Sequence, residues 1–431
     1  NTTHMIPPSL KNAITTCMIM TIALGFVSYE YILRTMPMPL AAEWLGAMSV
    51  NAAQLSQSNR VFFVLYALLQ IPIGMVIDQR GAKLWLKAGS LCCAAGCILL
   101  ALAPNFFLMV VARTLLTLGG ATATLCCFKL AINWLPSRCF GSICGVVGAI
   151  SMLCAWHGSQ LIQQASTPHW VIWLLQMGAL GLMIALLTHF VLLDAPMQRS
   201  PHLSRYMATT CRNLMRVLCT PSVWLCGIAM GLSFIPFSAL GLQWGTSYLE
   251  LSQQLNKHHA TLITKLLFAG GMVGCIGFGL ASDCWKNRKK TYLTGMVLAV
   301  TIMLYITLIK QHSNFTMGML WFLLGMFCAC GVLCFVIAKE AVPLSMGATT
   351  LAVVNTIMLS VGAGAQWLMT SLLTIHHSQH HYLVHTAVDY HRLFLLLPAG
   401  LVAAIMAIYF TNNNQVTQQP AYSQVETKPQ P

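Results

Sequence analysis

The chain alternates between long apolar segments and short polar intervals. Apolar runs of about twenty residues recur along its whole length, and each could cross about 30 Å of hydrocarbon as an α-helix. We place these runs at residues 13–36, 58–77, 84–103, 106–132, 140–164, 169–193, 222–249, 260–282, 292–310, 315–338, 345–375 and 391–411. The pattern therefore predicts an all-α polytopic membrane protein with twelve transmembrane helices.

Composition supports a lipid environment. Of the 431 residues, 57% are hydrophobic and only 7% are charged, far fewer charges than the roughly one quarter of a soluble domain. The net charge of +14 does not indicate nucleic acid, because the basic residues are scattered through short loops and form no basic arm. The 17 cysteines lie mostly inside apolar runs, so we expect small packing residues without structural disulfides.

The basic residues are distributed unevenly between the two sets of loops. With a cytoplasmic N-terminus, the outward loops contain chiefly Arg60, Lys257 and Lys310. The inward hinges contain Arg80, Lys83, Lys87, Arg138, Arg199, Arg205, Arg212, Arg216, Lys286, Arg288, Lys289 and Lys290. The positive-inside rule therefore predicts cytoplasmic termini, and we expect a multi-pass protein of a bacterial cytoplasmic (inner) membrane.

The longest polar interval lies between the sixth and seventh runs. Its arginines are spaced for an amphipathic helix on the membrane surface, so this interval is either a helical brace or a solvated linker. We expect an N-terminal six-helix bundle over 1–193, a cytoplasmic linker over 194–221, a C-terminal six-helix bundle over 222–411 and a disordered cytoplasmic tail over 412–431.

A charged hinge occurs once in each half. After the second run the chain has Gly74, Asp78, Arg80, Gly81 and Lys83. After the eighth run the corresponding residues are Gly279, Asp283, Lys286, Arg288, Lys289 and Lys290. Two halves of matching design are what alternating access around a midplane site requires.

Six plus six helices, a long central loop and a Gly-x-x-x-Asp-x-Arg-Gly-x-Lys hinge together resemble the major facilitator superfamily. Arg113, Gly119 and Gly120 are similar to its Arg-x-x-x-Gly-x-Gly pattern, with Thr117 at the first glycine position. The first hinge departs at Gln79 and Ala82, and the second has Lys286 in place of a glycine. The resemblance implies a secondary transporter rather than an enzyme, with no cofactor.

Asp78 is the main gating candidate. A carboxylate can bind the exposed amides at a helix N-terminus, and the resemblance puts that N-terminus near Met346 to Thr349. The alternative is a loop acid that balances Arg80 and Arg138. The further gating candidates are Gly74, Arg80, Gly81, Lys83, Lys129, Arg138, Gly279, Asp283 and Arg288.

Charged groups inside the spans are the main candidates for chemistry, because each costs about 2.5–3.5 kcal/mol at the centre of a bilayer. Glu30 and Arg34 are four residues apart and can pair on one helix face. In one interpretation Arg34 binds a substrate carboxylate or phosphate and Glu30 carries a proton. In the other, the pair neutralises itself at the outer interface, near the end of the first span.

Arg113 and His157 are further candidates. For Arg113 the resemblance implies proton or ligand coupling, and the alternative is hydrogen bonding to backbone carbonyls. For His157 we weigh proton coupling against packing. The remaining substrate-binding candidates are polar or aromatic residues of several spans, any of which could instead pack or anchor at the interface: Tyr29, Tyr66, Gln70, Gln243, Trp244, Tyr248, Lys265 and Asn355.

A histidine-rich outward loop precedes the last run, with His376, His377, His380, His381, His385 and His391. Imidazoles at this density could bind a metal. A solvated, pH-sensitive loop is the alternative, and we assign no metal site.

These features predict a monomeric secondary transporter of a small anionic or zwitterionic metabolite: a carboxylate, an amino acid or a short peptide. We expect alternating access driven by an ion gradient, because the sequence contains no ATP-binding P-loop. Glu30 and His157 favour proton symport. The alternatives are a proton-antiport exporter of amphipathic compounds and, from another class, a membrane-embedded transferase.

Overall fold

The computed structural model describes residues 8–37, 39–47, 51–166, 169–192, 203–308, 313–380 and 387–411. In these ranges every regular element is a helix, and twelve helices are long and apolar enough to cross a membrane. Six spans of the first half are α1 (Pro8–Thr35), α3 (Ala52–Arg80), α4 (Ala82–Ala101), α5 (Phe106–Trp134), α6 (Phe140–Leu153) and α8 (Trp170–Val191). Six of the second are α10 (Pro221–Pro236), α12 (Lys257–Trp285), α13 (Arg288–Leu308), α14 (Asn314–Cys328) with α15 (Leu333–Glu340), α16 (Gly347–His380) and α18 (Leu396–Tyr409).

Shorter helices connect or flank the spans. They are α2 (Ala41–Ala47), α7 (Ser159–Ser166), α9 (Leu203–Leu218), α11 (Gly245–Ser252) and α17 (Ala387–Phe394). Helix α9 lies within the polar interval between the halves, where the sequence left open a helix or a solvated linker. The supposed loop cations Arg60 and Lys257 lie instead inside α3 and at the first residue of α12.

Among the described residues, four spans are interrupted rather than continuous. The fifth contains a π-helix at Cys154–Gly158, the seventh a π-helix at Phe237–Gln243, and the tenth a 3-10 segment at Ala329–Val332. The twelfth breaks at Leu395, between α17 and α18. The sequence predicted unbroken helices over 140–164 and 222–249. An apolar run reports burial in lipid but not the hydrogen-bond register of the backbone, which is why these breaks were not foreseen.

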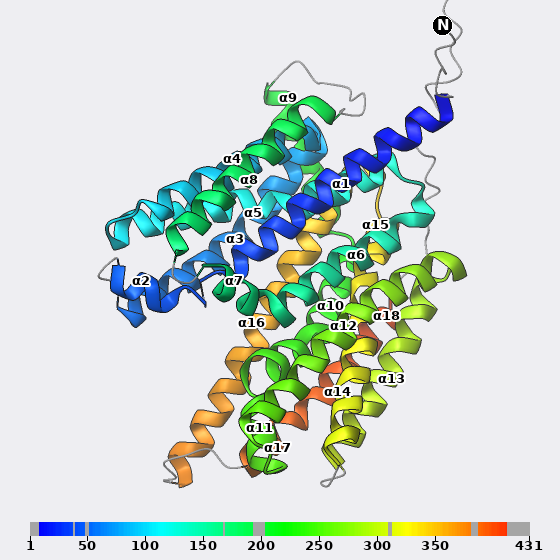
Figure 1. The fold of residues 1–431 in the computed structure, drawn as a ribbon. Coiled ribbons are helices and arrows are strands. Elements are labelled where there is room, and N and C mark those ends of the chain that lie inside the picture. Colours follow the sequence, from blue (N-terminus) through cyan, green and yellow to red (C-terminus); the bar gives the residue numbers. More distant parts are fainter. Residues whose placement is uncertain are drawn as a thin grey trace, which may run out of the picture.

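The spans form two bundles, α1–α8 and α10–α18, that meet at one end of the molecule. In Figure 1 the bundles converge around α15 and diverge toward α2 in the first half and toward α11 and α17 in the second. We call the converging end the closed end and the other the opposite end. Lys289 at the start of α13 donates to the carbonyl oxygens of Tyr409 (2.7 Å) and Thr411 (3.0 Å), so α18 finishes at the closed end.

Glycines allow the bundles to approach closely at two crossings. A Cβ atom on Gly145 of α6 would lie 2.3 Å from the carbonyl oxygen of Cys275 in α12. A Cβ atom on Gly74 of α3 would lie 2.7 Å from the Cβ of Ala352 in α16. Small residues at such crossings let backbones pack directly, as is common between membrane helices.

Some sequence expectations fall partly outside the described residues. His376, His377 and His380 belong to α16 and His391 to α17, whereas His381, His385 and the tail 412–431 lie outside the described ranges. Within those ranges, no three His, Cys, Asp or Glu side chains are grouped to hold a metal. All 17 cysteines, each within the described ranges, are free thiols.

Candidate functional site

Asp78 joins the two bundles at the closed end. Its carboxylate accepts hydrogen bonds from the backbone N–H groups of Ala348 (3.0 Å) and Thr349 (2.7 Å) and from the Thr349 hydroxyl (2.7 Å). These groups lie at the N-terminus of α16, where the free amides and the helix dipole favour an anion. Lys129 of α5 donates to the same carboxylate at 2.6 Å, and both side chains are almost fully buried. We call this set of contacts the first lock.

Asp283 makes the equivalent contact in the second half. It accepts from the N–H groups of Gly141 (3.2 Å) and Ser142 (2.6 Å) and from the Ser142 hydroxyl (2.5 Å), at the N-terminus of α6. Arg288 pairs with Asp283 at 2.5 Å and with Glu340 at 3.2 Å. This second lock therefore repeats the first, with a carboxylate of one bundle binding a helix N-terminus of the other.

The other gating candidates surround these locks. Arg80 ends α3, Lys83 lies in the first turn of α4, and Gly81 joins them with a φ of 85° that favours glycine. A Cβ atom on Gly279 would lie 2.6 Å from the carbonyl oxygen of Gly141. Arg138 is exposed in the 3-10 segment Ser137–Cys139, and Lys129 rather than Arg138 provides the cation for Asp78.

An aromatic contact between the bundles lies close to the locks. The rings of Phe128 in α5 and Phe335 in α15 are 5.1 Å apart, and Phe140 lies 5.7 Å from Phe128. The Lys339 ammonium lies 4.8 Å from the centre of the Phe140 ring. The sequence pattern did not indicate any of these residues, because neighbouring apolar positions in a continuous run give no sign of which face meets the other bundle.

Glu30 and Arg34 form an ion pair within the first bundle. Arg34 donates through Nε (2.9 Å) and Nη2 (2.6 Å) to Glu30 Oε1. The Glu30 side chain is 3% exposed and that of Arg34 is 20% exposed. Glu30 Oε2 is buried and has no hydrogen-bond partner among the described residues.

This pair lies at the middle of the bundle rather than at its end. A Cβ atom on Gly120 would lie 3.1 Å from Glu30, and the Arg34 guanidinium lies 4.3 Å from the Tyr66 ring centre. Gly120 is the central residue of α5, and Tyr66 is the central residue of α3, each 29 residues long. The pair does lie near the end of the first span, as the sequence indicated, because α1 ends at Thr35. The end of α1 therefore lies beside the centres of α3 and α5.

Arg113 lies on the same side of α5 as Gly120 but nearer the opposite end. Its Nη1 donates to Ser58 Oγ (3.1 Å) and Asn59 Oδ1 (2.5 Å) of α3. The guanidinium lies 5.3 Å from the Phe62 ring centre, and Phe62 stacks on Tyr66 with 6.4 Å between ring centres. Its hydrogen bonds therefore go to side chains rather than to the backbone carbonyls that the sequence suggested as an alternative.

The remaining substrate-binding candidates do not gather around Glu30. The Tyr29 hydroxyl donates to the Met177 carbonyl (2.9 Å), and the fully buried Gln70 amide donates to the Ala121 carbonyl (3.4 Å). Both side chains thus bind the backbone of neighbouring helices. Lys265 and Asn355 are half-buried in α12 and α16, and Gln243 is exposed at the end of the π-helix of the seventh span.

Of the last three candidates, Trp244, Tyr248 and His157, the latter two each contact a neighbouring side chain. Trp244 and Tyr248 are buried, and Tyr248 packs on Phe394 with 4.8 Å between ring centres. Burial raises the pKa of the Tyr248 phenol, so this group stays neutral. His157 lies in the π-helix of the fifth span, with Nδ1 3.1 Å from Gln160 Oε1.

Comparison with known proteins agrees with this architecture. The family description "Major Facilitator Superfamily" matches residues 18–366, and the chain belongs to this superfamily. It is therefore a multi-pass membrane transporter of a small solute and not an enzyme.

Individual relatives are distant. The chain is 22% identical over 330 residues to the probable L-galactonate transporter of Escherichia coli (strain K12), with 72% of each chain covered. Its fold is similar to that of the superfamily transporter FucP in the outward conformation (TM-score 0.71, 12% identity, 92% of this chain and 99% of the other). It is also similar to an inward-facing, unoccupied bacterial homologue of the human lysosomal transporter Spinster (TM-score 0.53, 15% identity, 92% and 96%).

Proposed function

We propose that the protein is a proton symporter of a small organic anion, and that Glu30 and Arg34 form its central site. The observation that carries this proposal is a buried acid–base pair at mid-depth whose acid has one free oxygen. That oxygen can accept a proton without displacing Arg34. A group of this kind inside a membrane is a candidate for transport chemistry by default.

Charge balance gives the coupling mechanism. The ionised pair is neutral overall, and so is the site when Glu30 is protonated and a substrate carboxylate has taken its place on Arg34. An anion alone would leave one uncompensated negative charge, and a proton alone one positive charge. Either is costly away from water, so the two are expected to bind and leave together.

The surroundings of Arg34 favour a carboxylate that carries further polar groups. Tyr31 and Tyr66 lie 4.9 and 4.3 Å from the guanidinium and hold it by cation–π contacts. The Nε and Nη2 groups of Arg34, which donate to Glu30, become available for bidentate binding of a substrate carboxylate when Glu30 is protonated. The relative named as a probable L-galactonate transporter supports a sugar acid as the first substrate to test, ahead of amino acids and short peptides.

Transport would proceed by rocking of the two bundles. We assign the closed end to the cytoplasm because the basic hinges gather there, and this puts both termini in the cytoplasm. We further propose that the protein lies in a bacterial inner membrane and acts as a monomer. The locks then close the cytoplasmic side while solute and proton reach Glu30 and Arg34 from outside. Opening of both locks releases them inward, as alternating access requires.

Proteoliposomes provide the test. An inward proton gradient should drive accumulation of labelled L-galactonate by the wild-type protein. Glu30→Gln should abolish this accumulation but retain exchange of internal for external L-galactonate, because the neutral amide mimics the protonated acid. Arg34→Gln should abolish both activities.

Glu250→Gln is the matched control, because Glu250 lies in α11, outside the membrane spans. It should transport normally. Unchanged proton-driven accumulation in Glu30→Gln would overturn the coupling mechanism. Proton-driven efflux with no uptake would favour the exporter.

A further inference from the structure

Arg113 is a buried cation without a buried anion. Arg113 is 4% exposed, and the two atoms that accept its hydrogen bonds, Ser58 Oγ and Asn59 Oδ1, belong to neutral side chains. Among the described residues no carboxylate forms an ion pair with it. A charge removed from water is costly unless it is paired, so this position is prepared for an anion that the chain itself does not provide.

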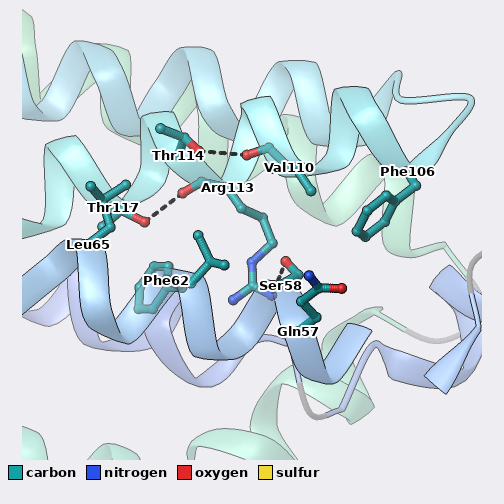
Figure 2. Close-up of a pocket in the computed structure, with 10 residues that line it drawn as sticks. Gln57, Ser58, Phe62, Leu65, Phe106, Val110, Arg113, Thr114 and Thr117 are labelled. Atoms are coloured by element: carbon teal, nitrogen blue, oxygen red, sulfur yellow. Dashed lines mark hydrogen bonds between the residues drawn. The ribbon is translucent and has the colours of Figure 1, made fainter. Parts of the chain in front are cut away.

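A cavity of about 150 Å³ lies beside this guanidinium, between the parts of α3 and α5 that are nearer the opposite end. Figure 2 shows Arg113 reaching from α5 across to α3, between Phe62 and Ser58. Gln57, Ser58, Thr114 and Thr117 contribute polar groups, and Phe62 contributes an apolar wall. A mostly apolar pocket with a few converging polar groups is typical of a site for a small molecule.

We infer that this cavity is a second anion site, in which Arg113 binds a single carboxylate or phosphate group. The inference rests on the proposed function for the choice of the solute carboxylate as occupant. A phospholipid headgroup has the same chemistry, and the experiment below separates the two sources. We call this site the outer anion site.

The outer anion site is aligned with the central one. Arg113 precedes Gly120 by seven residues on α5, which places it about 10 Å farther toward the opposite end. Phe62, beside Arg113, stacks on Tyr66, which contacts Arg34. A solute anion held at Arg113 would therefore need to move only about two helical turns to reach Arg34.

Binding stoichiometry tests this arrangement. In phosphatidylcholine nanodiscs, the wild-type protein should bind two equivalents of labelled L-galactonate. Arg113→Gln and Arg34→Gln should each bind one. Arg113→Gln should keep proton-driven uptake, with a KM raised about tenfold, which corresponds to about 1.4 kcal/mol of binding free energy.

Arg60→Gln is the matched control, because Arg60 is an exposed arginine at the same end of α3; it should keep both equivalents. Removal of Arg113 leaves no carboxylate unpaired, so Arg113→Gln should unfold at the wild-type temperature. Arg113→Lys should bind the labelled solute with intermediate affinity. A lower unfolding temperature with two equivalents still bound would assign Arg113 a structural role and overturn the site.

The remaining outcomes separate the outer site from the proposed function. If the wild type binds one equivalent, and this binding is lost in Arg34→Gln but kept in Arg113→Gln, the outer anion site alone is overturned. One equivalent lost only in Arg113→Gln overturns the central site alone, and no binding to any protein overturns the solute as occupant of both. Phosphatidylglycerol that co-purifies with the wild type but not with Arg113→Gln would assign the site to a lipid headgroup.

Discussion

Asp78 uses both carboxylate oxygens to hold α16 against α3, and Lys129 neutralises it from a third helix. An uncharged amide at this position could keep one hydrogen bond to the helix N-terminus but would leave the buried Lys129 without its counter-ion. Hydrogen bonds to charged groups contribute about 1.5–3 kcal/mol each. The closed state should therefore be sensitive to the charge of Asp78 and not only to its shape.

We accordingly expect Asp78→Asn to insert into the membrane normally and to lose at least about tenfold in the rate of proton-driven uptake. The reason is that the closed state that exposes the central site to the outside becomes less populated. Initial rates in proteoliposomes, normalised to the amount of folded protein, measure this effect.

Glu340→Gln is a suitable control, because Glu340 also pairs with a buried cation at the closed end but does not touch a helix N-terminus of the other bundle. It should lose much less activity. Equal rates for Asp78→Asn and the wild type would remove the gating role from the first lock.

At this scale the sequence identified the charges better than their neighbours. The hinge pattern led to Asp78, because a repeated polar motif is conspicuous among apolar runs, and the resemblance to the superfamily led to the segment containing Ala348 and Thr349. Phe335 and Lys339 were not identified, since their importance depends on which face of α15 meets the first bundle. The sequence placed Glu30 near the end of its span but did not show that this end lies beside the centres of α3 and α5, because hydropathy does not fix how far a helix is shifted along its axis.

Among the described glycines that face the other bundle, those at the crossing of α6 and α12 have the least free space. Gly141, Gly145 and Gly148 of α6 all lie against α12, and the Cβ position of Gly145 is only 2.3 Å from a backbone oxygen. A backbone atom cannot move aside as a flexible side chain can. One methyl group at Gly145 must therefore separate the two helices.

We expect Gly145→Ala to disturb the closed state and reduce uptake several-fold, while the same change at Gly277 has no effect. Gly277 lies on α12 with nothing within 4 Å of its Cβ position. Transport assays on both variants, with unfolding temperatures measured alongside, check this expectation. Equal loss in the two variants would indicate a general effect of alanine rather than a close crossing.

The elements themselves were largely predictable, and their internal breaks were not. All twelve spans follow from apolar runs of sufficient length, because lipid requires each crossing segment to satisfy its own backbone hydrogen bonds. The π-helices at Cys154–Gly158 and Phe237–Gln243 shift that hydrogen bonding by one residue without a change in hydropathy. Their presence depends on packing against other helices, which a single sequence does not report.

At the scale of the whole molecule, the first and second locks lie at the same end and exchange roles between the bundles. The first half binds the N-terminus of α16, and the second half binds the N-terminus of α6. Each lock joins one bundle to a helix N-terminus of the other. The two locks therefore act on a single equilibrium between closed and open arrangements of the same halves.

A native thiol reports this equilibrium. Cys275 of α12 is fully buried, and its Sγ lies 2.8 Å from the Cβ position of Gly148 in the other bundle, so it should become reactive only when the bundles separate at the closed end. We expect Asp78→Asn and Asp283→Asn each to speed its labelling by N-ethylmaleimide about tenfold. The double variant should reach about a hundredfold, because independent contributions add in free energy. Cys97, which is buried within the first bundle beside the Tyr29 hydroxyl, should stay unlabelled in every variant. Peptide mass spectrometry resolves the two thiols, and labelling of both at equal rates would mean that the variants loosen the fold instead of opening the locks.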